Sequence, residues 1–152
     1  MNLEIKQAKR EDASLILEFI NAIAKYEKLA NEVEAKVSDI EKSIFDNQDA
    51  YVVIAYLNKQ PVGFALYYYN YSTFKGKKGL YLEDLFVYKP YRAMGIGNKL
   101  FEYLRSLAKK ENCGRMEWVC LNWNQKAIDF YQKKQASPLK DWTTFRLDET
   151  KL

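Results

Sequence analysis

Residues 81–100 read YLEDLFVYKPYRAMGIGNKL, and this stretch decides the fold. An apolar and aromatic strand is predicted to end at Pro90, and a turn that contains Gly95 and Gly97 follows it. A helix is predicted next, because apolar residues recur at helical spacing at Leu100, Phe101, Leu104, Leu107 and Ala108. Glycines let the backbone approach a ligand, and the free N–H groups at a helix start bind anions. The layout therefore predicts a phosphate site.

Two common phosphate motifs do not fit this turn. A P-loop has Lys followed by Ser or Thr directly after its second glycine, whereas Asn98 follows Gly97 here. A dinucleotide-binding fingerprint needs a third glycine at the right offset, and the turn has none. The local chemistry alone leaves two interpretations open: a phosphate site of another kind, or an ordinary strand–turn–helix connection.

The composition predicts a single folded domain. A chain of 152 residues with 48% hydrophobic residues can bury one core, so residues 1–152 are expected to form one domain. The sequence has no apolar run that could span a bilayer and no signal-peptide pattern at its N-terminus. We therefore expect no membrane association and a cytoplasmic location.

The ionisable side chains restrict the chemistry. The chain has no histidine, so acid–base steps must use carboxylates, Tyr, Cys, Lys or water. Cys113 and Cys120 are interpreted as reduced packing residues, and no metal site is expected. Residues 1–50 carry 11 acidic and 7 basic side chains, whereas residues 51–152 carry 9 and 17. This asymmetry suits a cationic ligand in the first part and a polyanionic one in the second, although most of these charges belong to solvated faces.

Periodicity along the chain predicts an α/β fold. The predicted order is strand, two helices, three strands, helix, strand, helix, strand, with a mixed sheet whose N-terminal half is antiparallel. The predicted ranges are strand 3–5, helices 12–29 and 38–45, strands 51–57, 62–69 and 81–88, a helix to 111, strand 116–121, helix 125–134 and strand 142–147.

Several motifs resemble one superfamily over nearly the whole chain. The pattern Arg92-x-x-Gly95-x-Gly97 resembles the acetyl-CoA pyrophosphate loop of the GNAT superfamily of N-acetyltransferases. Asn124, followed by Phe130-Tyr131, resembles a second motif of the same superfamily. The diamine (spermidine/spermine) acetyltransferase branch has stretches similar to residues 24–27, 62–68 and 81–87. The resemblance implies the GNAT-like acyl-CoA N-acyltransferase fold, a central mixed sheet flanked by about four helices.

Three positions depart from the family pattern. Ala93 stands where a glycine usually follows the arginine, which is still compatible with a helix start, and Gln135 replaces a glycine after the last helix. Thr143 stands where the polyamine enzymes have an acidic residue before a Trp-Arg pair. The acceptor is therefore expected to be shorter or less cationic than spermidine.

The resemblance also implies an acetyl-CoA site. Backbone N–H groups would hold the pantetheine and polarise the thioester carbonyl at Leu85, Phe86 and Val87. The pyrophosphate would lie on Arg92, Ala93, Met94, Gly95, Ile96, Gly97 and Asn98. Further coenzyme contacts are expected from Asn124, Gln125, Lys126, Ala127 and Tyr131.

The predicted reaction is direct attack of a primary amine on the thioester. At pH 7 only about one alkyl ammonium in 2,500 is neutral, because its pKa is ~10.4. Glu83 is expected to bind the ammonium and relay its proton through water, and Tyr131 to protonate the departing thiolate. For Asp84 a structural role and a functional role are equally compatible with the sequence. For Glu83 the alternative interpretation is a carboxylate that points into solvent and has no function. The residues expected to contact the amine are Tyr26, Glu27, Glu83, Glu117, Trp118 and Val119.

The identity of the acceptor stays open at this point. A small diamine or polyamine-like amine is the leading hypothesis, and a thialysine-like side-chain amine or a protein lysine is the alternative. A nucleic-acid-binding module would suit the pI of about 8.9, but the basic residues are scattered and no nucleic-acid motif occurs, so no such partner is expected. By resemblance we expect a homodimer that pairs through its C-terminal region, where Trp142 and Phe145 are the large apolar residues.

Overall fold

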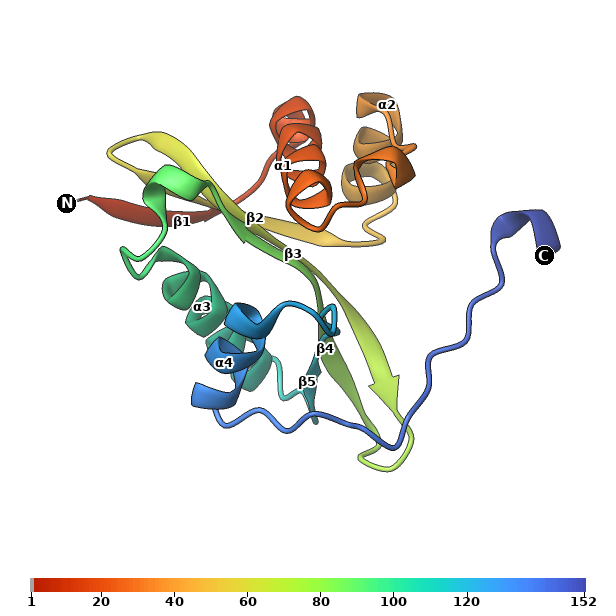
Figure 1. Ribbon diagram of the computed structural model, residues 1–152. Coiled ribbons are helices and arrows are strands. Elements are labelled where there is room, and N and C mark those ends of the chain that lie inside the picture. Colours follow the sequence, from red (N-terminus) through yellow and green to blue (C-terminus); the bar gives the residue numbers. More distant parts are fainter. Residues whose placement is uncertain (1) are drawn as a thin grey trace. The chain divides into compact units, whose positions relative to one another are not determined.

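The computed structural model describes residues 2–152 and contains one five-stranded sheet with helices (Figure 1). The strands are β1 (Leu3–Gln7), β2 (Tyr51–Leu57), β3 (Gln60–Ser72), β4 (Lys77–Val87) and β5 (Met116–Glu117). The helices are α1 (Ala13–Tyr26), α2 (Val37–Ile40, continued by a widened turn, Glu41–Asp46), α3 (Ile96–Lys110) and α4 (Gln125–Lys133). The chain divides into two compact units, a first that runs to Val119 and a second from Cys120 to Leu152.

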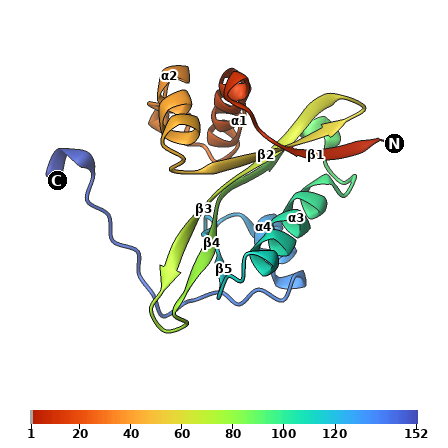
Figure 2. The ribbon, with the colours of Figure 1, turned by 180° about the vertical axis from the view of Figure 1, so that it is seen from behind.

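The sheet follows the order β1-β2-β3-β4-β5. The first three pairings are antiparallel, and β4 pairs with β5 in parallel. The prediction of a mixed sheet with an antiparallel N-terminal half is therefore confirmed. In the first unit, α1 and α2 cover one face of this sheet, and α3 covers the other (Figures 1 and 2).

The amphipathic helices explain the core of the first unit. Phe19 of α1 is fully buried, and its ring stacks on that of Phe64 in β3 with centroids 4.9 Å apart. Burial of one such side chain stabilises the fold by about 1.5–3 kcal/mol. On the opposite face of the sheet, α3 buries the apolar stripe predicted for it, which includes Leu100, Phe101 and Leu104.

Of the predicted strands, one is shorter in the structure and another is absent. The predicted strand 116–121 is a strand only at Met116–Glu117, where it pairs with Leu80 and Tyr81. Residues 142–147 form no strand, and they pair with no strand anywhere in residues 2–152. A strand needs a neighbour for its backbone N–H and C=O groups, so an apolar stretch without one stays irregular. The first helix also ends three residues early, at Tyr26, because Lys28 adopts a left-handed φ of 64°.

Candidate active site

The glycine turn lies between β4 and α3. Gly95 caps α3 with a left-handed φ of 80°, a conformation that glycine adopts without strain. A Cβ added to Gly97 would meet only a Val87 methyl group, at 3.8 Å, so the protein itself has room for a side chain there. The absence of one leaves the backbone at the start of α3 open to a close-lying anion, which fits a pyrophosphate.

Two of the departures from the family pattern share one structural cause. Ala93 has a φ of 64° and Gln135 has a φ of 66°, both in the left-handed region that favours glycine. The family glycines at these positions are therefore explained by backbone conformation. Ala93 also lies outside α3, which begins at Ile96, so the interpretation of Ala93 as part of a helix start was wrong.

The second edge of β4 offers backbone groups to a ligand. On one edge, Leu85, Phe86 and Val87 pair with Ala65, Phe64 and Gly63 of β3. On the other edge, β5 pairs only with Leu80 and Tyr81, so the rest of β4 has no strand neighbour there within residues 2–152. An extended chain such as pantetheine can bind this kind of edge in strand fashion.

A β-bulge places the two carboxylates of β4. The pairing passes from Leu82 opposite Tyr67 to Asp84 opposite Leu66, so Glu83 is the extra residue. A bulge bends the strand and changes the direction of its side chains. Glu83 is exposed, whereas Asp84 is partly buried. The charge of Glu83 acts on both Asp84 and Glu27, which lies at the end of α1, and the charge of Glu27 also acts on Asp84. The structure thus places Glu27, Glu83 and Asp84 close enough for their charges to interact, and the role of Glu27 and Glu83 in amine binding stays a prediction.

Burial and neighbouring carboxylates raise the pKa of two members of this cluster, Asp84 and Glu27. Burial, followed by the charges of Glu83 and Glu27, raises the pKa of Asp84 to about 7. Burial and the charge of Glu83 also raise the pKa of Glu27. No lysine or arginine among residues 2–152 forms an ion pair with any of the three. The cluster therefore suits an ammonium ion supplied by a ligand.

Two tyrosine rings lie near Glu83 of this cluster. The rings of Tyr68 and Tyr81 lie 5.0 Å apart, and in each the pKa is raised by burial first and then by other charges that include Glu83. Glu117 pairs with Tyr81 across β4 and β5 and contributes to the same pKa shift. Such rings can contact the alkyl chain of an amine, and their faces can contact its ammonium group.

The remaining predicted amine contacts lie in different surroundings. Tyr26 ends α1 and packs edge-on against Phe86, with centroids 6.4 Å apart. The ring of Trp118 packs edge-on against Phe101 of α3, and Val119 is exposed. The role of Trp118 and Val119 in amine binding stays a prediction.

The second unit contains the other predicted residues. Asn124 caps α4, because its side-chain oxygen accepts a hydrogen bond of 3.3 Å from the Ala127 N–H. Gln125 and Lys126 follow on exposed positions of the first turn. Tyr131 is partly buried in α4, with its ring 5.5 Å from that of Phe130. The cap gives the motif asparagine a structural role, and the coenzyme contacts of this segment stay predictions.

The described residues include no group of three or more Cys, Asp or Glu side chains that could hold a metal ion. None of the helices within residues 2–152 combines the length and hydrophobicity that crossing a membrane requires.

Asp84→Asn is expected to change the pH dependence of stability. The folded state binds the Asp84 proton more tightly than the unfolded state, whose ordinary aspartate pKa is about 3.8, so the free energy of unfolding falls as pH rises from about 4 to 7. At pH 8 the asparagine variant should be more stable than the wild type by about 2–4 kcal/mol, and this gain should disappear near pH 4. Urea unfolding at both pH values measures the difference. The exposed Asp49→Asn is the control, and a loss of stability at pH 8 in Asp84→Asn would contradict the raised pKa of Asp84.

The sheet with a free β4 edge and the glycine turn at the start of α3 fit an acyl-CoA-dependent acyltransferase. Comparison with known proteins identifies the family. The sequence model of the acetyltransferase (GNAT) family matches residues 16–136, and the chain belongs to this family. It is an acetyl-CoA-dependent N-acetyltransferase, as the resemblance predicted.

Three similar proteins show how far the likeness extends. Thialysine N-epsilon-acetyltransferase of Bos taurus is 33% identical over 95% of this chain and 91% of its own length. Spermidine/spermine N(1)-acetyltransferase-like protein 1 of Homo sapiens is 32% identical over 98% of this chain and 23% of its own length. The solved structure of an integron cassette protein from the mobile metagenome of V. cholerae has a TM-score of 0.80 and 27% identity, covering 97% of this chain and 93% of that one.

Proposed function

We propose that the enzyme transfers the acetyl group of acetyl-CoA to a primary amine of a small, cationic, diamine- or polyamine-like acceptor. The observation that carries the proposal is the cluster of Glu27, Glu83 and Asp84, which forms no ion pair with a lysine or arginine of residues 2–152 and has tyrosine rings near Glu83. The names of the similar proteins support an amine acceptor. Acetyl-CoA would lie on the β4 edge and the glycine turn and would supply the activated acetyl group.

The cluster also helps to remove the ammonium proton. Transfer from a pKa of ~10.4 to an ordinary glutamate of ~4.3 costs about 8 kcal/mol. Transfer to Asp84, whose pKa is raised to about 7, costs about 5 kcal/mol. We therefore assign Glu83 to ammonium binding and to the water-mediated relay, and Asp84 to accepting the proton. Asp84 could not be preferred from the sequence, because the bulge that places it depends on strand pairing.

Two glutamine variants should separate binding from chemistry. Glu27→Gln is expected to raise the KM for a diamine tenfold or more with kcat largely intact, because an ion pair at ~4 Å contributes about 1–4 kcal/mol. Glu83→Gln should lower kcat as well, because it acts at the reacting amine. The KM effect of Glu27 should shrink in 0.5 M salt, and the exposed Glu32→Gln is the matched control. An unchanged diamine KM in Glu27→Gln would place acceptor recognition elsewhere.

The alternative acceptor is an amino-acid side-chain amine. The identity to thialysine N-epsilon-acetyltransferase and the absence of an acidic residue at Thr143 both favour it. A free carboxylate on the acceptor would need a cationic partner, which a diamine does not. Comparison of kcat/KM for putrescine, spermidine, lysine and thialysine decides between the two. The diamine proposal is wrong if lysine or thialysine is preferred by an order of magnitude.

We also propose that the enzyme is a homodimer formed by one N-acetyltransferase domain per chain. Trp142 and Phe145 are 78% and 90% exposed, in a segment that has no strand partner within residues 2–152. A second copy would supply the missing contacts. Light scattering at micromolar concentration should give the dimer mass, and Trp142→Ser with Phe145→Ser should shift it to the monomer. A monomer mass for the wild type would contradict the proposal. The proposed function also includes a cytoplasmic location and no nucleic-acid partner.

A further inference from the structure

The side chain of Arg92 turns back from the glycine turn toward the sheet. Its Nε donates a hydrogen bond of 2.8 Å to the Val87 carbonyl, at the end of β4. Its backbone N–H bonds to the Lys89 carbonyl at 3.2 Å, so the same residue is tied to the turn. The side chain is partly buried. Arg92 therefore joins the turn expected to hold the pyrophosphate to the strand that carries the carboxylates.

The guanidinium group of Arg92 lies over two aromatic rings. Its central carbon is 4.9 Å from the ring centroid of Tyr26 and 5.2 Å from that of Phe86. The two rings are nearly perpendicular, at 80°. A guanidinium over a ring is attracted to the negative face of the ring, and the attraction is stronger where the cation is desolvated. Tyr26 directly precedes Glu27, and Phe86 lies two residues after Asp84, so this contact fixes both sides of the amine site.

Packing, and not charge neutralisation, is the action of Arg92 on this site. The raised pKa values of Glu27 and Asp84 come from burial and from neighbouring carboxylates, and Arg92 does not contribute to either shift. A cation at the end of α1 is also favourable toward the carbonyl groups of that helix terminus. The arginine can thus hold Tyr26 in place and leave the carboxylates available to an ammonium ion.

We propose that Arg92 is a positioning residue that couples the coenzyme turn to the amine site, so that coenzyme and acceptor bind with positive cooperativity. The inference rests on the proposed function, because it needs the amine at Glu27 and Glu83. A phosphate bound to the turn restricts Arg92, and Arg92 restricts Tyr26 and with it the start of the acceptor site. Coupling of this kind is reciprocal, so the amine should tighten coenzyme binding by the same factor.

Titration calorimetry with coenzyme A as the probe tests the coupling. The second ligand is whichever amine of the panel has the highest kcat/KM. We expect coenzyme A to lower the Kd of this amine about fivefold or more in the wild type, and the amine to lower the Kd of coenzyme A equally. In Arg92→Lys and Arg92→Gln the factor should fall to about one. Tyr26→Leu should also remove the coupling, whereas Tyr26→Phe keeps the ring and should retain it.

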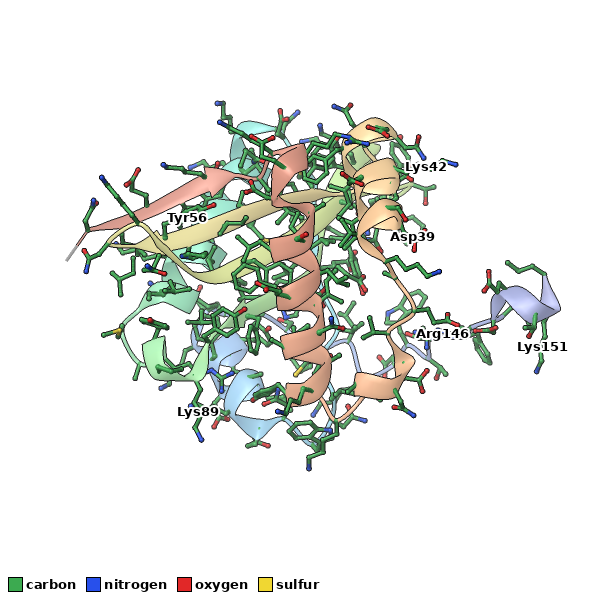
Figure 3. The ribbon with its side chains drawn as sticks, turned by 90° about the horizontal axis from the view of Figure 1, so that it is seen from above. Asp39, Lys42, Tyr56, Lys89, Arg146 and Lys151 are labelled. Atoms are coloured by element: carbon green, nitrogen blue, oxygen red, sulfur yellow. The ribbon has the colours of Figure 1, made fainter. Side chains whose placement is uncertain are left out.

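A matched control comes from the same turn. Lys89 is exposed and points outward (Figure 3), so Lys89→Gln removes a nearby charge and should leave the coupling unchanged. An Arg92 variant that weakens coenzyme A binding and keeps the wild-type coupling factor overturns the inference, because Arg92 would then be a phosphate ligand alone. A wild type that acetylates the amine without coupling refutes only this inference. A wild type that acetylates no amine of the panel refutes the proposed function and the coupling with it.

Discussion

Tyr131→Phe is expected to lower kcat by about 10²- to 10⁴-fold with little change in coenzyme affinity. The substitution keeps the ring that packs against Phe130 and removes only the hydroxyl group. A thiol and a phenol differ in pKa by only about 1.5, so a tyrosine hydroxyl can protonate a departing CoA thiolate. Loss of one acid–base group has an effect of this size. Steady-state kinetics at saturating acetyl-CoA, with coenzyme affinity measured separately, provide the test.

The matched control for Tyr131 is another tyrosine whose hydroxyl is removed. Tyr56 lies on β2, in the first unit, and its partly exposed ring packs against the core (Figure 3). Tyr56→Phe should leave kcat within about twofold, because surface-accessible changes away from a site are nearly neutral. If Tyr131→Phe also leaves kcat unchanged, water protonates the thiolate and Tyr131 is a packing residue of α4.

Gly97→Glu is expected to abolish stabilisation by acetyl-CoA. The coenzyme binds only the folded state, so at 100 times its Kd it should stabilise the wild type by about 2.7 kcal/mol, or about 5–10 °C in Tm. A glutamate at this position places a negative charge where the phosphates are expected, in the first turn of α3. A carboxylate there is favourable to the helix itself, so the variant should fold. Thermal unfolding with and without acetyl-CoA measures the loss.

Gly97→Ala distinguishes the effect of side-chain volume on acetyl-CoA binding from the effect of negative charge. Its Cβ would contact only the Val87 methyl group at 3.8 Å, so the fold has room for it. We expect normal stability without ligand and a smaller loss of the acetyl-CoA effect than in Gly97→Glu. A full wild-type shift in Gly97→Glu would show that the phosphates bind elsewhere.

The sequence by itself determined the family, the glycine turn and the amphipathic helices. These features depend on spacing over a few residues, as in the apolar stripe of α3 or the pair Gly95 and Gly97. Such local spacing can be recognised in a single sequence. Glu27 and Glu83 are far apart along the chain. Both were nevertheless predicted to contact the amine, because the prediction came from the resemblance to the diamine branch.

Tertiary structure decided the features that depend on strand pairing and on packing between distant segments. The bulge at Glu83 depends on the register between β3 and β4, and it makes Asp84 a partly buried carboxylate with a raised pKa. The contact of Arg92 with Tyr26 joins residues far apart in the chain. Residues 142–147 have the composition of a strand and lack a partner within residues 2–152. A backbone ladder and a buried charge are both properties of neighbours, and a sequence does not name the neighbours that folding brings together.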